Sequence, residues 1–144
     1  MTDTNSTNNF DNNTISTNKP HKLTIATQNV QSISNLIKQN QLIQHIKLNT
    51  IDIMGISETN LKKQEAIHFH LHNSADYTYF FSSSKDHHIG SGVGLIIKKD
   101  ISMHIFNTGS IDGRTVFVDI HSKGKQVLRI IQIYLHSNKK HIIE

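Results

Sequence analysis

Cysteine and tryptophan are absent from the 144 residues of this chain, and proline occurs once, at Pro20. Without cysteine the chain has no disulfide scaffold, thiolate zinc finger, iron–sulfur centre or cysteine nucleophile. No apolar run approaches the roughly 20 residues that span a bilayer, and the first residues lack the apolar stretch of a secretory signal. These absences predict an intracellular protein, nuclear or cytoplasmic and not secreted, with no membrane segment.

The charge of the chain is modestly positive. Fifteen Lys and Arg residues stand against 11 Asp and Glu, which gives a net charge of +4 with neutral histidine. This balance permits a phosphate-bearing partner without requiring one. Three lysine pairs near expected loops could attract phosphates: Lys62–Lys63, Lys98–Lys99 and Lys139–Lys140. Ordinary surface lysines that keep a protein soluble are the alternative interpretation.

Composition divides the chain into two regions. Residues 1–20 are dominated by Asn, Thr and Ser, with only Met1, Phe10 and Ile15 as larger apolar residues. Such a segment buries too little surface to offset its ordering entropy. We therefore expect a disordered tail over 1–20 and one domain over 21–144. Asn138–Glu144 resembles the start of a helix, after which the sequence stops, so the domain is expected to be truncated.

The first part of the domain has the pattern of a strand, a helix and a strand. Leu23–Val30 alternates apolar and polar residues, as a strand does. Ser34–Leu48 has helical periodicity, with Ser32 or Ser34 as its N-cap. Ile51–Ile56 is a nearly continuous apolar run, which is typical of a buried central strand. The order predicts a parallel pair of strands joined by a crossover helix.

The second part of the domain reads as short strands. Gln64–Leu71 is expected to form a short helix. Strands are predicted at Tyr77–Ser82, Gly92–Ile97, Ile101–Phe106, Val116–His121 and Val127–Tyr134. Turns between them are indicated at Gly109–Ser110, Asp112–Gly113 and Lys123–Gly124. The fold class is therefore α/β (α+β), with a mixed, mostly antiparallel sheet and one or two helices.

Two polar residues stand where the first two strands end. Asn29 closes the first strand, and Glu58 follows the second. Parallel neighbours place their carboxyl ends side by side, and ligands favour that edge. A carboxylate and a carboxamide there could hold a hard divalent cation. In the alternative interpretation Glu58 caps a helix and Asn29 makes a turn.

Histidines offer a second candidate site. His68, His70 and His72 occupy alternate positions. On a strand they would share one face and could bind zinc, whereas on a helix they would spread apart. We favour a polar surface segment, and we interpret His87–His88 in the same way.

Four segments, in order, resemble the endonuclease/exonuclease/phosphatase superfamily, which has the DNase I-like fold. The resemblance covers about Lys22 to Asn138 and is closest to the apurinic-type endonuclease domains of non-LTR retrotransposons. The segments are "TIATQNV" ending in Asn29, "IDIMGISET" with Glu58, "GSGVGLIIKK" around the core strand Ser91–Lys98, and "GRTVFVDI…LRIIQIYLHSN" over Gly113–Asn138.

The resemblance implies a partial DNase I-like sandwich whose C-terminal half is missing. It implies magnesium- or manganese-dependent hydrolysis of phosphodiesters by a DNA endonuclease of retroelement type. DNA is then the partner, together with the reverse transcriptase portion of a longer polyprotein. Two alternatives remain, a non-catalytic remnant that binds nucleic acid and a phosphatase acting on small phosphoesters.

The resemblance also implies roles for individual residues. Glu58 would be the metal ligand, and Asn29 would orient that carboxylate or the metal-bound phosphate. Tyr134 would contact the scissile phosphate, and a tyrosine at this position favours the nuclease branch. Arg114 would either contact phosphate or pin its strand.

The chain departs from the family pattern at two residues and by the absence of two motifs. His136 stands where the family often has proline, and Asn138, a further candidate for phosphate contact, comes one place late. The "GDFN"-like and late "SDH"-like motifs, which orient the attacking water and complete the site, do not occur. We therefore expect little or no hydrolysis by this chain alone.

Overall fold

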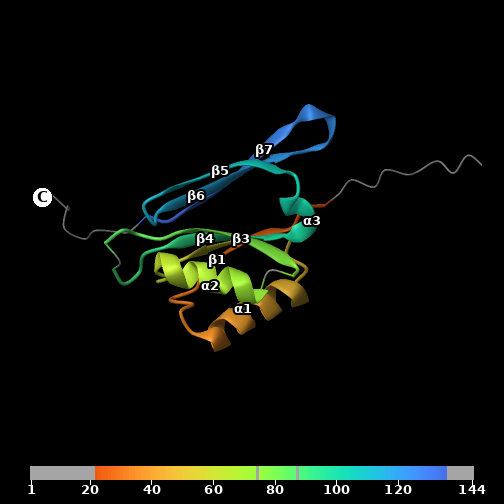
Figure 1. Cartoon of the computed structure of the whole chain (residues 1–144). Coiled ribbons are helices and arrows are strands. Elements are labelled where there is room, and N and C mark those ends of the chain that lie inside the picture. Colours follow the sequence, from red (N-terminus) through yellow and green to blue (C-terminus); the bar gives the residue numbers. More distant parts are fainter. Residues whose placement is uncertain (1–21, 74, 87, 136–144) are drawn as a thin grey trace, which may run out of the picture.

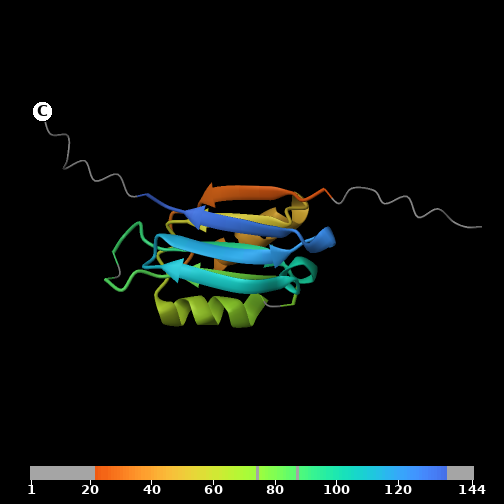
Figure 2. The same cartoon turned by 90° about the horizontal axis from the view of Figure 1, so that it is seen from above.

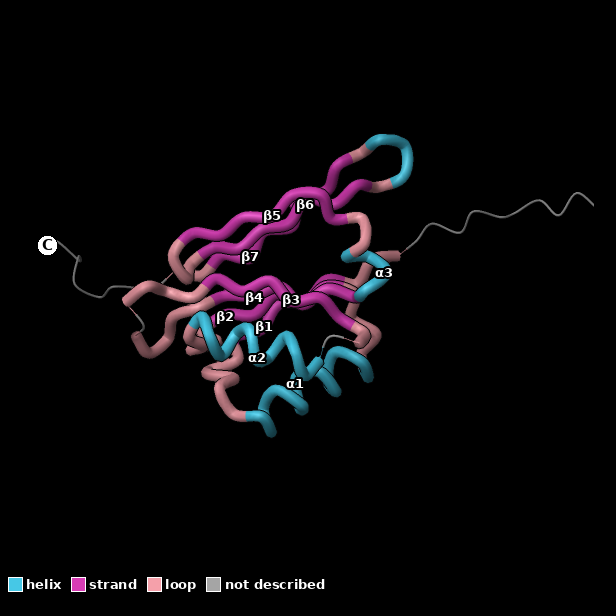
Figure 3. The backbone as a smooth tube through the Cα atoms, in the orientation of Figure 1, coloured by secondary structure: helices cyan, strands magenta, loops and turns pink. Residues whose placement is uncertain are grey.

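The computed structural model describes residues 22–73, 75–86 and 88–135, which form three layers (Figure 1, Figure 3). Two helices lie on one face of a four-stranded sheet, and a three-stranded sheet covers the other face. The expected tail over 1–20 and the expected helix start at Asn138–Glu144 lie outside the described residues.

Sheet A has the strand order β1-β2-β4-β3. Its strands are β1 (Ile25–Asn29), β2 (Ile53–Ser57), β3 (Tyr77–Ser82) and β4 (Val93–Lys98). β1 and β2 are parallel, and the other pairs are antiparallel. The predicted crossover unit and the buried central strand are confirmed, since all five residues of β2 are buried.

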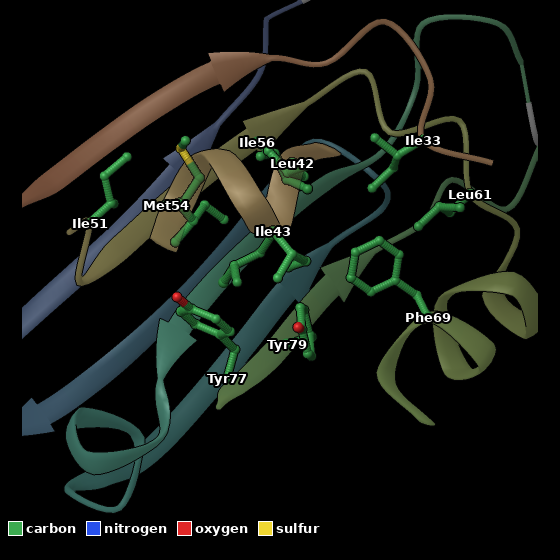
Figure 4. Packing of buried hydrophobic residues seen from close by; sticks show 12 residues of the cluster. Ile33, Leu42, Ile43, Ile51, Met54, Ile56, Leu61, Phe69, Tyr77 and Tyr79 are labelled. Atoms are coloured by element: carbon green, nitrogen blue, oxygen red, sulfur yellow. The ribbon is translucent and has the colours of Figure 1, made fainter. Parts of the chain in front are cut away.

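Helices α1 (Leu36–Leu48) and α2 (Lys63–Asn73) cover one face of sheet A. Their apolar residues meet Met54 and Ile56 of β2 and the tyrosines of β3 in one cluster (Figure 4). Phe69 of α2 packs edge-on against the ring of Tyr79, with ring centroids 5.0 Å apart. No helix among the described residues combines the length and the apolar character needed to cross a bilayer.

Sheet B consists of β5 (Ile105–Ile111), β6 (Thr115–His121) and β7 (Val127–Ile133), all antiparallel. The short 3-10 helix η1 (Lys123–Lys125) joins the last two strands. A second apolar cluster fills the space between the sheets, where Val118 and Ile120 of β6 meet Leu95 of β4. β7 lies over the β1 side of sheet A (Figure 2), where Thr27 Oγ1 donates to Gln132 Oε1 at 3.1 Å.

Three sequence-based details are wrong. The strand predicted at Ile101–Phe106 begins at Ile105 and is preceded by a one-turn helix, α3 (Lys99–Ser102), which adds to the one or two helices expected. Ile101 and Ile105, four residues apart, both pack on the core between the sheets, and a helical turn allows this. Gly109 lies within β5 instead of a turn, and the ring of Phe117 on β6 occupies the space where a side chain at position 109 would be.

The third error concerns the start of α1. Its N-cap is Asn35, whose side-chain oxygen accepts a hydrogen bond from the backbone N–H of Ile37 at 2.7 Å. Ser32 and Ser34 instead bond to each other at 3.1 Å. Asparagine and serine are equally good caps, so the sequence could not separate these positions.

Candidate active site

Strand ends of both sheets meet at one edge of the molecule, which we call the site edge. β1 and β2 both end there, at Asn29 opposite Ser57, and β4 begins there at Val93. β6 begins and β7 ends at the same edge, with Thr115 opposite Ile133. A backbone hydrogen bond from Gly92 N to Gly113 O, 3.1 Å long, joins the two sheets at this point.

Glu58 and Tyr134 meet at the site edge although 76 positions separate them in sequence. Glu58 follows β2 of sheet A, and Tyr134 follows β7 of sheet B. The Tyr134 hydroxyl donates to Glu58 Oε1 at 2.5 Å, and both residues are half-buried. This hydrogen bond, then burial, then the charge of Glu58 raise the pKa of Tyr134 above its ordinary value. The phenol therefore stays protonated and remains a donor at physiological pH.

Asn29 lies on the neighbouring strand, one register position before Glu58. Its partner across the ladder is Ser57, whose carbonyl oxygen accepts from Val30 N at 3.0 Å. The Asn29 side chain is exposed, and its Oδ1 accepts from the backbone N–H of Gln31 at 3.1 Å. Asn29 thus makes a turn at the edge, as the alternative interpretation expected.

Arg114 stands before β6 and holds Tyr134 through its backbone. The Arg114 carbonyl oxygen accepts from Tyr134 N at 2.9 Å, while its guanidinium side chain is exposed. The hydrogen bond that pins the strand is therefore made by the main chain of Arg114. Asn138 and His136 lie outside the described residues.

The two loops at the site edge share an unusual backbone. Four residues other than glycine have positive φ: Gln31 (45°), Ser32 (77°), Glu58 (55°) and Asn60 (52°). The loops are bonded to each other, with Ser32 N donating to Glu58 O at 2.8 Å. Left-handed conformations cost free energy for L-residues and cluster at functional sites. Because four such residues, Glu58 included, lie together here, the backbone conformation also indicates a functional site at this edge, without reference to the side chains.

Three residues beside Glu58 were not singled out from the sequence. Asn60 Oδ1 accepts from Gly90 N at 2.7 Å, and Asn60 N donates to Ser91 O at 2.9 Å. A Cβ on Gly90 would stand 4.0 Å from the carboxyl carbon of Glu58. The glycines of "GSGVG" were a signal for this approach, but they were interpreted only as part of a core strand.

The lysine pairs do not gather on one surface. Lys62 and Lys63 are exposed beside the site edge, where they line a groove of about 1040 Å³ that Asp112 also lines. Lys98 lies at the opposite edge of sheet A in an ion pair with Asp52, with Nζ 2.8 Å from Oδ1. Lys139–Lys140 lies outside the described residues.

The histidine segment lies on α2, where Phe69 is buried and His68 is exposed. The segment is therefore helical, and the strand geometry in which the three histidines would share one face does not occur. Within the described ranges, no three His, Asp or Glu residues are close enough to hold a metal ion together. Glu65, and not Glu58, caps α2, since its Oε2 accepts from Lys62 N at 2.8 Å.

The sequence model of the Endonuclease/Exonuclease/phosphatase family matches residues 26–134. Among the curated proteins none matches the chain.

Three solved structures share the fold. The TDP2 protein of D. rerio, complexed with single strand DNA product, is 17% identical over 83% of this chain and 48% of its own, with a TM-score of 0.56. An AP endonuclease from Archaeoglobus fulgidus is 24% identical over 78% of this chain and 41% of its own, with a TM-score of 0.57. The AP endonuclease LMAP from Leishmania major is 14% identical over 78% and 39%, with a TM-score of 0.60.

These structures confirm the partial DNase I-like fold expected from the sequence. The chain spans less than half the length of each of these three proteins.

Proposed function

The chain belongs to the Endonuclease/Exonuclease/phosphatase family, and we propose that it carries the metal-holding part of a site that hydrolyses phosphodiesters in DNA. The family is one of hydrolases. The contact that carries the proposal is the 2.5 Å hydrogen bond between Tyr134 and Glu58. It brings the two sheets together at the edge where ligands of α/β sheets bind.

Glu58 suits a divalent cation by its chemistry and position. Magnesium binds in proteins through one or two carboxylates and keeps several waters. Glu58 offers one half-buried carboxylate at the site edge, and Asn29 stands beside it on β1. Glu58 would thus hold Mg²⁺ or Mn²⁺, and Asn29 would orient the carboxylate or a phosphate. When bound there, the metal would supply Lewis-acid stabilisation of negative charge on the phosphate.

Tyr134 would orient both the carboxylate and the substrate. Its raised pKa keeps the hydroxyl protonated, so it can donate to Glu58 or to a phosphate oxygen. Arg114 fixes the backbone of Tyr134 and leaves its own side chain exposed at the same edge. The guanidinium is therefore available for a bidentate contact with phosphate.

The type of endonuclease is proposed from the sequence. We propose a DNA endonuclease of retroelement type, with the reverse transcriptase portion of a longer polyprotein as partner. The four segments that resemble retrotransposon endonuclease domains support this assignment. Tyr134 favours it over a phosphatase of small phosphoesters. The residues that would orient the attacking water have no counterpart in this chain, so we propose that hydrolysis by the 144 residues alone is very slow.

Metal binding tests the site directly. Isothermal calorimetry with Mg²⁺ and Mn²⁺ gives the affinity, and paramagnetic broadening of amide NMR signals by Mn²⁺ gives the location. We expect broadening centred on Glu58 and residues 29–32, lost in Glu58→Gln. Glu65→Gln is the matched control, because it makes the same chemical change in another half-buried glutamate, at the start of α2.

Nicking of supercoiled plasmid tests the activity. The wild-type chain is expected to nick no faster than buffer with Mg²⁺. Nicking that disappears in Glu58→Gln would overturn the proposed inactivity while supporting the site. A folded chain whose Mn²⁺ broadening is the same in Glu58→Gln would overturn the metal site, leaving a remnant that binds nucleic acid without catalysis.

A further inference from the structure

A tight turn projects from the site edge beside Glu58. It runs from His88 to Ser91, with Ser91 N donating to His88 O at 3.1 Å. Gly90, its third residue, has a φ of +83°. A type II turn requires positive φ at this position, which glycine adopts without strain. Ile89 therefore occupies the first of the two corner positions of the turn, and its side chain is exposed.

Three more hydrogen bonds hold this turn in place. Ser91 Oγ donates to the carbonyl oxygen of His88 at 2.7 Å, and Ser91 is buried. Asn60 bonds the turn twice, through Oδ1 to Gly90 N at 2.7 Å and through its own N–H to Ser91 O at 2.9 Å. Asn60 has a φ of 52°, which asparagine tolerates better than most residues. The turn is thus fixed to the loop that carries Glu58.

Ile89 is 91% exposed, the highest fraction among the large apolar residues in the described part of the chain. Its neighbour Gly90 approaches the carboxyl carbon of Glu58, to which an added Cβ would be 4.0 Å away. A single exposed aliphatic residue on a loose loop needs no explanation. Here the turn has four fixed hydrogen bonds and stands next to the candidate metal ligand.

We propose that Ile89 contacts the nucleoside next to the phosphate bound at Glu58, with Asn60 as the positioning residue for the turn. This inference rests on the proposed function, because it takes the phosphate at Glu58 as given. Because Gly90 approaches the carboxyl group of Glu58, a nucleoside attached to a phosphate at this carboxylate would lie beside the turn. Sugar carbons and base edges offer apolar surface to an aliphatic side chain, and exposed aliphatic residues can wedge against a base step.

The contact is apolar, so it has a signature that phosphate contacts lack. Removing a lysine–phosphate contact reduces the slope of log affinity against log salt concentration. Removing an apolar contact lowers affinity at every salt concentration and leaves the slope unchanged. Fluorescence anisotropy of a short labelled DNA duplex, with Ca²⁺ in place of Mg²⁺ to suppress cleavage, measures both quantities.

We expect Ile89→Ala to weaken binding about fivefold, because part of one isoleucine side chain is no longer buried against DNA. Its salt slope should equal that of the wild type. The control Leu48→Ala truncates another exposed aliphatic residue, 76% exposed at the end of α1 and remote from Glu58, and should bind like the wild type. Lys62→Ala should reduce the slope instead.

Asn60→Gly separates positioning from contact. Glycine accepts the positive φ at this position but cannot receive the hydrogen bond from Gly90 N. If Asn60 acts through Ile89, the double variant Asn60→Gly/Ile89→Ala loses no more affinity than Ile89→Ala alone. Additive losses would show that Asn60 does not act through Ile89 and would overturn its positioning role.

The outcomes distinguish this inference from the proposed function. DNA binding that is equal in Ile89→Ala and the wild type overturns the contact and leaves the metal site intact. A wild-type chain that binds Mn²⁺ at Glu58 but no DNA overturns the contact and the DNA substrate together. A salt slope that falls in Ile89→Ala would show that the variant disturbs charged contacts, and it would also overturn the apolar contact.

Discussion

The two sheets of this protein differ in how many of their faces are covered. Sheet A lies between the helices and sheet B, and every residue of its central strand β2 is buried. Sheet B covers sheet A with one face only, and its other face exposes Ile111, Ile131 and Ile133. The sheet buried on both faces carries Glu58, whereas the sheet buried on one face contributes Tyr134. The site therefore depends on the docking of an exposed sheet onto a rigid one.

The two sheets also differ in the contacts that hold their strands together. On the outer face of sheet B, Asp119 accepts from Arg129 Nε at 2.6 Å and from Asn107 Nδ2 at 2.8 Å. The Arg129 guanidinium also stacks on Phe117, 4.6 Å from the ring centroid. An ion pair thus holds three strands together where no apolar layer from the described residues covers them. In sheet A, apolar packing does this on both faces.

Matched truncations give the largest expected contrast. Ile56→Ala in β2 should lower the free energy of unfolding by about 2–5 kcal/mol, because Ile56 is 0% exposed and its removal leaves a cavity. Ile131→Ala in β7 should cost about 1 kcal/mol or less, since Ile131 is 49% exposed. Denaturation by urea measures both. Equal losses would mean that the outer face of sheet B is covered in solution.

The next largest loss of stability is expected from substitution of Gly113, where the two sheets meet. Gly113 has a φ of +68°, and a Cβ there would lie 2.5 Å from the backbone nitrogen of Ser84. Gly124, in the hairpin of sheet B, has a φ of +77° but open space around it. Gly113→Ala should destabilise the protein by about 2–4 kcal/mol and Gly124→Ala by about 1 kcal/mol.

Similar unfolding midpoints for the two glycine variants would contradict this expectation. They would show that the β5–β6 turn is not held against residue 84. The Mn²⁺ signal at Glu58 provides a second readout, since loosening this joint also moves Tyr134.

The ion pair on sheet B gives a pH-dependent prediction. Hydrogen bonds from Arg129 and Asn107 lower the pKa of Asp119 to about 2, below its ordinary value of about 4. A lowered folded-state pKa stabilises the protein above about pH 4, and this stabilisation is lost as the pH falls towards 2. The difference in Tm between the wild type and Asp119→Asn should therefore shrink over that window. A difference that stays constant from neutral pH to pH 2 would contradict the assignment.

Much of the fold could be predicted from the sequence because sheet A is buried on both faces. The apolar run Ile51–Ile56 has no polar face, which is the pattern of a central strand. The region after Lys98 was harder, because residues four positions apart, such as Ile101 and Ile105, share a face both in a strand and on a helix. Gly109 was wrongly predicted to lie in a turn. A glycine is needed there to make room for the ring of Phe117 on the neighbouring strand, and the local sequence does not show this contact.

The candidate site could be predicted only in part. The positions of Asn29 and Glu58 at neighbouring strand ends follow from local patterns. The contact between Glu58 and Tyr134 depends on how two sheets dock, and no local pattern specifies that. The turn at Ile89 was also missed, because its hydrogen bonds to Asn60 join segments 30 positions apart.

The hydrogen bond between the two sheets provides the smallest and most specific prediction. Glu58→Gln removes the hydrogen bond to a carboxylate, which is the main cause of the raised pKa of Tyr134, together with the charge of Glu58, so this pKa should fall towards the ordinary value of about 10. Absorbance of the phenolate during alkaline titration measures it. Subtracting the matching Tyr134→Phe protein removes Tyr77 and Tyr79, whose pKa values burial also raises.

The raised pKa of Tyr134 also determines how the stability of the protein changes with pH. A folded-state pKa raised above 10 stabilises the wild type below about pH 10, and this stabilisation is lost as the pH rises through the folded-state value. Glu58→Gln should show less of this alkaline loss than the wild type. If Tyr134 titrates identically in both proteins, its hydroxyl does not bond to Glu58 in solution. Sheet B would then be docked by the apolar cluster and by the remaining hydrogen bonds between the sheets, such as Gly92 N to Gly113 O, without the contact between Tyr134 and Glu58.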